Sequence, residues 1–492
     1  MEGVFPKKWY EMMRGNILSF LCGVGILLLA VGCVEDEKFS TPAGARLTFS
    51  TDTVTMDTVI AGSGSITRQF SIHNNSGEGI SITDIGFLNN EADGFGVLVD
   101  GVRVGETLGT SIDCRSKDSL LAFVKITPTE SGQDEKVLHE AVLVFTLANG
   151  VQQRVVLQAY GQDVIWLNDT HISKNMVLDA RRPYVVRDSL MVDEGVILTL
   201  QAGVRLMFRS NGFLRVDGTL VTNGTAEDPV VLRGDRMDYM FTNQPYDRIS
   251  GQWKGVILTS KSYGNHLQYC DIHSGSYGIL CEESDTTKEK LRLENSVIHN
   301  VTGTGLETYN AKIFVGNTQI SNAGGNCVCL YGGSNEFVHC TIAQFYPFNG
   351  LRGAALYYSN VLGNKKYSLE KAQFTNCIIT GYSEDEIMGE REDLYDSGKF
   401  NYAFSHCLLD TPETVDDNIN NVVWDKKPHS VYREGNFRKF DLDALSYDFQ
   451  LDSLSAAIGI ADIVATRKYY PYDRCGKPRL ADGASDAGCY ER

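Results

Sequence analysis

The stretch that decides the fold is "ENSVIHN" at Glu294–Asn300, which returns twenty-two positions later as "GNTQISN" at Gly316–Asn322. Four more segments align with the first Asn of this phrase, and they begin at Tyr269, His339, Asn376 and His406. Consecutive copies are 26, 22, 22, 37 and 30 residues apart. A minimal step of 22 residues, lengthened by insertions, is typical of a solenoid in which each copy is one coil.

Two positions of the phrase keep the same kind of side chain in all six copies. Because side chains alternate between the faces of a strand, the second and fourth positions point the same way, and we expect that direction to be the interior. The predicted ladders are Cys270, Ser296, Thr318, Cys340, Cys377 and Cys407 at the second position, and Ile272, Ile298, Ile320, Ile342, Ile379 and Leu409 at the fourth.

The segment before the repeats also consists of short β runs, each ended by Gly or Asn. It contains "LTLQAGV" at Leu198–Val204, "VDGTL" at Val216–Leu220, "GTAEDPVVL" at Gly224–Leu232 and "GQWKGV" at Gly251–Val256. Such runs cannot bury a face alone and must stack on neighbouring coils. The phrases closely resemble the opening coils of bacterial right-handed parallel β-helices of the pectin-lyase-like type. We therefore expect such a helix over residues 175–410 of an all-β chain.

Residues 46–163 follow a different pattern. Apolar and polar residues alternate in runs such as "TRQFSIHNNS" at Thr67–Ser76 and "QRVVLQAYG" at Gln153–Gly161, with Gly, Asn and Pro between the runs. Several short strands over this length predict an immunoglobulin-like β-sandwich. The order of the runs resembles the Hydin-type and choice-of-anchor D modules of bacterial surface proteins.

The N-terminus has the composition of a secretion signal. Basic residues precede an apolar run at Ile17–Val31, which is too short for an ordinary membrane span. The run leads into "LLLAVGC", which resembles the lipobox of bacterial lipoproteins, and this resemblance implies that Cys33 is acylated. We expect a signal peptide over residues 1–32 and a linker over 33–45, and the alternative is an uncleaved anchor helix.

The remaining charge pattern bears on location and partners. The net charge of −17 argues against nucleic-acid partners, because phosphate recognition needs a basic surface. "VEDEK" at Val34–Lys38 resembles the export signal of surface lipoproteins of the Bacteroidetes. The expected location is the outer membrane, lipid-anchored and exposed at the cell surface. The expected partners are the lipid bilayer and a polysaccharide or another surface protein.

The chain has 12 cysteines, and those of the ladder are expected to act as small buried hydrophobes. In the tail, Cys475 and Cys489 are candidates for a disulfide, although sequence does not fix their separation. The tail "YDRCGKPRLADGASDAGCYE" at Tyr472–Glu491 resembles the ending of choice-of-anchor Q β-helix proteins. We expect residues 411–492 to form a cap that closes the last open coil.

One candidate reactive cluster lies at outward positions of neighbouring coils. Asp271, His273 and His299 belong to it, and the two histidines share one register, about 4.8 Å apart. The group suits a metal ion or general acid–base catalysis. The alternative is that these are half-exposed histidines without a functional role.

A candidate glycan-binding row consists of Glu307, Tyr309, Tyr331 and Tyr357. Tyr309 and Tyr331 are twenty-two residues apart and so share a face, and Tyr357 continues the row after a loop. Aromatic rows suit the apolar faces of sugar rings. The alternative is a tyrosine ladder that stabilises the pairing of strands.

The longest acidic insertion is "YSEDEIMGEREDLYDSG" at Tyr382–Gly398. Its residues Glu384, Asp385 and Glu386 are possible ligands of Ca²⁺, and the alternative is a solvated charged loop. No other cofactor is predicted.

The β-helix resemblance makes catalysis the first functional question. The "NTD", "GHG" and "RIK" signatures of the β-helical polygalacturonases are missing from the sequence. We therefore expect a non-catalytic surface module for binding or adhesion, with glycans as its ligands. A polysaccharide lyase or glycoside hydrolase is the first alternative, with Asp271, His273 and His299 as catalytic residues. A purely structural surface protein is the second.

Overall fold

The computed structural model describes residues 38–39, 42–105, 111–392, 399–425 and 435–492. Cys33 and the predicted signal peptide lie outside the described residues. The chain divides into two compact units. The smaller unit comprises Met1–Val54, Thr67–Lys125 and Glu140–Leu157, and the larger unit comprises Thr55–Ile66, Ile126–His139 and Gln158–Arg492. Within the described part of the chain, no helix is long and apolar enough to span a membrane.

The predicted N-terminal strands form two five-stranded sheets. The first orders β1 (Thr48–Phe49), β3 (Arg68–His73), β8 (Ser119–Ile126), β5 (Phe95–Val99) and β6 (Val102–Arg103). The second orders β2 (Thr53–Ile60), β10 (Gln152–Gln162), β9 (Val137–Leu147), β4 (Ile80–Phe87) and β7 (Ile112–Cys114). Phe70 of β3 and Phe145 of β9 meet edge to face in the core, with ring centroids 6.5 Å apart. The immunoglobulin-like nature of these sheets stays a prediction.

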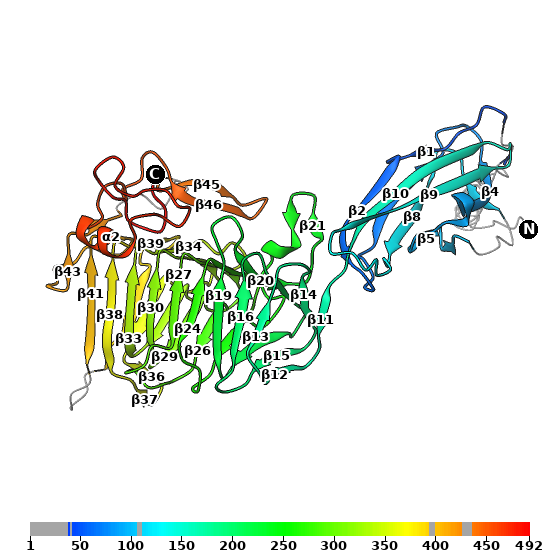
Figure 1. Cartoon of the computed structure of the whole chain (residues 1–492). Coiled ribbons are helices and arrows are strands. Elements are labelled where there is room, and N and C mark those ends of the chain that lie inside the picture. The colour runs from blue at the N-terminus through cyan, green and yellow to red at the C-terminus, as the bar shows by residue number, and fades with distance from the viewer. Residues whose placement is uncertain (1–37, 40–41, 106–110, 393–398, 426–434) are drawn as a thin grey trace, which may run out of the picture. The chain divides into compact units, whose positions relative to one another are not determined.

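Three long parallel sheets build the larger unit (Figure 1). Sheet 1 orders β11 (Ile165–Leu167), β14 (Tyr184–Val186), β17 (Arg205–Phe208), β20 (Val230–Gly234), β25 (Cys270–His273), β28 (Val297–Val301), β31 (Gln319–Ala323), β34 (Thr341–Gln344), β39 (Ile378–Gly381), β42 (Leu408–Leu409) and β44 (Val423–Trp424). Sheet 2 orders β12 (Thr170–Ile172), β15 (Ser189–Val192), β18 (Phe213–Val216), β23 (Val256–Leu258), β26 (Ile279–Cys281), β29 (Leu306–Tyr309), β32 (Val328–Tyr331), β35 (Leu356–Ser359) and β40 (Ile387–Glu390). Sheet 3 orders β13 (Met176–Leu178), β16 (Ile197–Gln201), β19 (Thr219–Asn223), β24 (Asn265–Gln268), β27 (Leu291–Glu294), β30 (Lys312–Gly316), β33 (Gly333–Val338), β38 (Leu369–Thr375), β41 (Phe400–Ser405) and β43 (Ile419–Asn420).

Each coil up to β40 therefore contributes one strand to each sheet, and the prediction of an all-β chain with a parallel β-helix is confirmed. The parallel strands begin at Ile165, ahead of the expected start at residue 175, and they continue to Trp424. The register pairs Ile272 with Ile298 and Ile298 with Ile320. All twelve residues of the two expected ladders are fully buried. The phrase repeats because like side chains stack on like in the interior of the helix.

The Asn residues of the phrase have a second role that the pattern analysis did not include. The first residue of all six copies has φ between 46° and 56°, which is the left-handed region. Asn295 and Asn317 stand there in the two opening copies, and Asn317 Nδ2 donates to Asn295 Oδ1 at 2.6 Å. Asn is one of the few non-Gly residues that visits this region readily, so the copies mark the sharp corner between sheet 3 and sheet 1.

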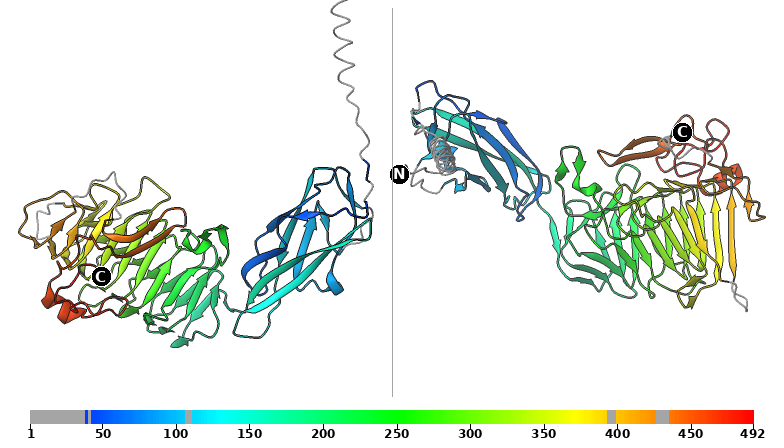
Figure 2. Two further views of the ribbon diagram at one scale, coloured as in Figure 1. Left: turned by 90° about the horizontal axis from the view of Figure 1, so that it is seen from above. Right: turned by 180° about the vertical axis from the view of Figure 1, so that it is seen from behind.

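The C-terminal cap contains the hairpin β45 (Phe437–Asp441) and β46 (Ser446–Leu451) and the helix α2 (Ile463–Tyr469). It was expected to close the last coil, but it lies along the outer face of sheet 1 (Figure 2). The Gly488 N–H donates to the Asn376 carbonyl at 2.8 Å, two coils before the last strand of sheet 1. Apolar residues that face outward on sheet 1, such as Ile378, pack under the cap and explain this placement.

The predicted disulfide is wrong in this structure, where Cys475 and Cys489 are both free thiols. Cys475 is exposed, whereas Cys489 is buried between the cap and sheet 1. Its Sγ lies 3.4 Å from Thr341 Oγ1. The side chain of Cys489 is thus used for packing against the sheet, and burial raises the pKa of its thiol to about 12.

Two short hairpins are inserted between coils. They are β21 (Tyr239–Phe241) with β22 (Gln244–Pro245), and β36 (Val361–Leu362) with β37 (Lys365–Lys366). The second hairpin lies in the 37-residue step from His339 to Asn376, so this longest step contains added structure outside the coil, as the uneven spacing predicted.

Candidate functional site

Asp271, His273 and His299 lie together on the outer face of sheet 1. Asp271 and His273 are two positions apart on β25. His299 lies on the neighbouring strand β28 and pairs in register with His273. Asp271 Oδ1 lies 2.9 Å from His273 Nδ1 and 3.3 Å from His299 Nε2. The two imidazole rings stack with centroids 4.8 Å apart. One carboxylate oxygen is therefore shared by two imidazoles on adjacent, rigidly paired strands.

The cluster favours the ionised form of the Asp271 carboxyl group. Burial alone would raise the pKa of Asp271, but the charge and hydrogen bonds of His273 and His299 hold it well below its usual value. Burial also lowers the pKa of His273, although Asp271 opposes this shift. The side chain of His273 is 8% exposed, whereas those of Asp271 and His299 are 28% and 24% exposed. His273 is thus the most buried member of the cluster, and Asp271 and His299 face a pocket.

That pocket has a volume of about 300 Å³ and lies between sheet 1, the cap and the segment that contains Arg248. Its floor consists of Asp271, Val297, His299, Asn300, Gln319, Ser321 and Asn322. Its walls consist of Arg248, Leu445, Ser446, Tyr447, Phe449, Arg474 and Tyr490. The sequence analysis placed the cluster on an open outer face, and the cap converts that face into a concave, polar site.

Two arginines on the pocket wall have no carboxylate partner within ion-pair distance among the described residues. Arg248 donates from Nη1 to the Ala444 carbonyl at 2.6 Å. The Nε of Arg474 is buried and has no hydrogen-bond partner. Several other part-buried arginines of this unit form ion pairs, for example Arg233 with Asp247 at 2.9 Å, whereas Arg352 stacks on the Tyr382 ring. Neither wall arginine was singled out in the sequence, because only the fold brings the two together.

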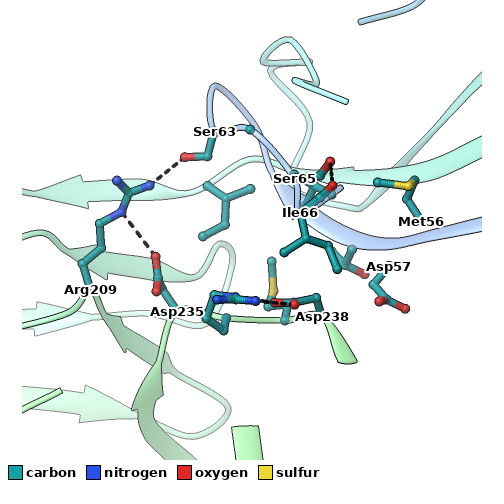
Figure 3. A pocket seen from close by; sticks show the side chains of 14 residues that line it. Met56, Asp57, Ser63, Ser65, Ile66, Arg209, Asp235 and Asp238 are labelled. Carbon is teal, nitrogen blue, oxygen red and sulfur yellow. Dashed lines mark hydrogen bonds and ion pairs between the residues drawn. The ribbon is translucent and has the colours of Figure 1, made fainter. Parts of the chain in front are cut away.

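A second pocket of the larger unit is shown in Figure 3 and has a volume of about 180 Å³. Its charged groups are mutually satisfied. Arg209 lies 3.3 Å from Asp235, and Arg236 donates to Asp238 at 2.6 Å. Because these charges neutralise one another, the pocket offers less to a charged ligand than the pocket over Asp271.

The tyrosine row lies on the outer face of sheet 2. Tyr309 pairs in register with Tyr331, and their rings are parallel within 4° with centroids 5.3 Å apart. Tyr357 pairs with Cys329, two positions earlier on the strand, so its ring is tilted by 56° toward Tyr331. Tyr309 OH donates to Glu307. The rings of Tyr309 and Tyr331 stack on each other, so these ring faces are not available to a sugar. The arrangement favours a ladder that stabilises the strand pairing over a sugar-binding platform.

The proposed calcium ligands do not converge. Glu384 and Asp385 are exposed, whereas Glu386 is fully buried. Glu386 accepts hydrogen bonds from the backbone N–H groups of Ser383 at 2.6 Å and Ala355 at 2.8 Å. Its oxygens are therefore used inside the fold, and the described part of this loop does not present three carboxylates to one ion.

Comparisons with known proteins give remote matches. No protein-family model and no curated protein matches the sequence. A family 28 exopolygalacturonase from Yersinia enterocolitica is 8% identical, covering 72% of this chain and 89% of its own, with a TM-score of 0.24. The catalytic unit of a GH87 α-1,3-glucanase from Streptomyces thermodiastaticus is 11% identical. The match covers 72% of this chain and 74% of the glucanase chain, with a TM-score of 0.21.

A PapD-like domain of human CEP192 is 12% identical, covering 27% of this chain and 96% of its own, with a TM-score of 0.18. Two further solved structures are matched over only 25% and 42% of their own length. At these identities and scores, the neighbours leave the function to be argued from the site itself.

Proposed function

We propose that this protein is a surface lipoprotein that binds an anionic polysaccharide in the pocket over Asp271, His273 and His299. The observation that carries this proposal is the pair of arginines, Arg248 and Arg474, without carboxylate partners on the pocket wall. Asp271 acts on Arg474, and Asp441 on Arg248, only at longer range, and among the described residues neither carboxylate forms an ion pair with these arginines. A carboxylate or sulfate group on a sugar supplies the missing acceptor.

The other lining residues suit the hydroxyl groups of a saccharide. Asn300, Gln319, Ser321 and Asn322 place amide and hydroxyl groups along the floor. Tyr447 lies on the wall beside them and contributes an apolar ring with a polar end. A pocket of about 300 Å³ accommodates a small part of a chain, so the polysaccharide would be held at one or two residues.

A second candidate function is cleavage by β-elimination, which the imidazole of His299 in the same pocket favours. The imidazole would take the proton from the carbon next to a uronate carboxylate, whose developing charge the arginines stabilise. The C–O bond to the leaving sugar breaks, the departing oxygen takes a proton from solvent, and a carbon–carbon double bond remains. Hydrolysis is less favoured, because Asp271 is the single carboxylate of this lining and glycosidases need a pair.

Arg474→Gln is expected to weaken binding of a uronate-containing polysaccharide by about 10-fold or more, since a charge-assisted contact is worth about 1.5–3 kcal/mol. Gel retardation of the full chain on uronate, sulfated and neutral polysaccharides measures this, and unsaturated uronate absorbance reports elimination. The matched control is Arg438→Gln, whose guanidinium bonds Gln450 on the exposed cap surface at 2.6 Å. Equal retardation of both variants, or equal binding of neutral polysaccharide, would rule out the anionic ligand.

Anchoring is a separate part of the proposal and rests on the sequence around Cys33. Cys33→Ala is expected to abolish acylation and to move the protein from the membrane fraction to the soluble fraction. Metabolic labelling with a fatty-acid analogue, followed by fractionation, measures both effects. The control is Cys475→Ala, which removes an exposed thiol of the tail. Unchanged labelling of the Cys33 variant would refute the lipid anchor.

A further inference from the structure

We infer that Asp271, His273 and His299 form a binding site for one divalent first-row transition-metal ion. Each residue offers one ligand atom, and these three atoms all lie within 4.8 Å of one another. This inference does not depend on the proposed polysaccharide, because it concerns the three side chains alone.

The two distances from Asp271 to the histidine nitrogens match the edges of a metal coordination shell. Asp271 Oδ1 is 2.9 Å from His273 Nδ1 and 3.3 Å from His299 Nε2. Ligands bonded to one ion at about 2.0–2.2 Å are about 2.9 Å apart in octahedral geometry and about 3.4 Å apart in tetrahedral geometry. The cluster therefore needs only small side-chain movements to bind an ion.

The donor set selects the kind of ion. Two imidazole nitrogens and one carboxylate oxygen suit Zn²⁺, Co²⁺, Fe²⁺ or Mn²⁺. Ca²⁺ is disfavoured, because it takes six to eight oxygen ligands. His266 provides an internal contrast, since its Nε2 lies 2.9 Å from Glu294 but no third His, Cys, Asp or Glu ligand completes a site there among the described residues.

The scaffold holds the ligands in place and leaves one side open. Asp271 and His273 lie on the same face of β25, and His299 lies beside His273 on the hydrogen-bonded strand β28. Trp253 Nε1 donates to the His273 carbonyl at 2.8 Å and fixes the backbone at this point. Asp271 and His299 line the pocket, so the remaining coordination positions would face it. Three protein ligands with open positions are typical of a site that binds a further ligand.

Metal binding and the elimination candidate make opposite demands on His299. With a metal ion bound, the imidazole is a ligand and does not act as a base. Arg248 and Arg474 would then hold an anionic group next to the metal. Metal binding without polysaccharide tests the site, and polysaccharide binding without metal tests the proposed function, so either can fail separately.

The experiment titrates Zn²⁺ into the metal-stripped full chain in detergent, in competition with a chromogenic chelator, and records the absorption spectrum with Co²⁺. We expect one ion to bind per chain. We also expect the absorption bands of bound Co²⁺ to be those of an ion coordinated by imidazole nitrogens. Asp271→Asn and His299→Gln should each lower the affinity for Zn²⁺ by about 100-fold or more, because loss of a direct ligand exceeds the 10–100-fold cost of losing an outer-shell partner.

His266→Gln is the matched control and should leave the Zn²⁺ affinity unchanged. The side chain of His299 is partly exposed, like that of Asp271, so its replacement leaves no closed cavity and His299→Gln is expected to fold. Its thermal unfolding is compared with that of His266→Gln. An affinity that falls equally in His299→Gln and His266→Gln would overturn the site. The absence of a saturable ion in the unmodified chain would do the same.

Discussion

Replacing Phe374 by alanine is expected to lower the free energy of unfolding of the larger unit by about 3–5 kcal/mol. Phe374 is the middle ring of a stack inside the β-helix, and its side chain is fully buried. Its centroid is 4.8 Å from Phe337 on one side and 4.9 Å from Phe404 on the other. Removing the ring leaves a gap between two coils that the parallel strands on each side hold open.

Urea unfolding followed by circular dichroism measures this loss. Phe348→Ala is the matched control, because that ring is 47% exposed and its removal should cost much less. Phe374→Leu should lie between the two, since it fills part of the gap but loses both ring contacts. A loss below about 1 kcal/mol for Phe374→Ala would mean that the coils close over the gap, and the rigid stacking described above would be wrong.

The interior of the helix was predictable because its signal is local and repeated. Period-2 alternation fixed which face of each strand points inward, and the step of 22 residues fixed which coils stack. The left-handed corner at Asn295 and Asn317 was also within reach, since Asn at a fixed place in a β repeat is typical of that backbone conformation.

The cap was not predictable in the same way, because its position depends on contacts between distant residues. Arg479 Nη2 donates to Asn317 Oδ1 at 2.7 Å and to the Gly488 carbonyl at 2.9 Å. The bond to Asn317 fixes the tail to a coil in the middle of the helix, and no local pattern near Arg479 indicates that partner. Placement of the cap also decides the candidate site, since Arg474 reaches the pocket only through it.

The candidate cluster was therefore predicted in part. Register alone brought Asp271, His273 and His299 together, because they share a strand or pair directly across two strands. The same register correctly predicted that Tyr309 and Tyr331 are neighbours, but after the loop before Tyr357 the register is shifted by two positions. Counting residues from one copy to the next predicts the strand register between coils of equal length. The prediction fails where an insertion changes the residue at which the next strand begins.

A buried carboxyl group gives the second large expected effect, a dependence of stability on pH. Burial raises the pKa of Glu386 to about 7, and Asp410 adds to the shift, although the N–H groups of Ser383 and Ala355 oppose it. In the unfolded chain the group titrates near its ordinary value of 4.5. The folded protein therefore binds this proton more tightly, and the stabilisation is present below pH 4.5 and lost as the pH rises to about 7. At 1.36 kcal/mol per pKa unit, the loss is about 3 kcal/mol.

Urea unfolding of the full chain between pH 5 and pH 8 tests this. Glu491 also has a pKa raised by burial to about 7, so both groups lower the stability as the pH rises. His273 and His339, whose pKa values burial lowers, act in the opposite direction. Compared with the unmodified chain, Glu386→Gln should therefore lose less stability between pH 5 and pH 8, even though the amide costs some stability at every pH by facing a backbone N–H. Glu384→Gln, on the exposed part of the same loop, should leave the decline intact. An unchanged slope in Glu386→Gln would show that Glu386 is ionised in the folded protein, because its two backbone N–H donors then outweigh its burial.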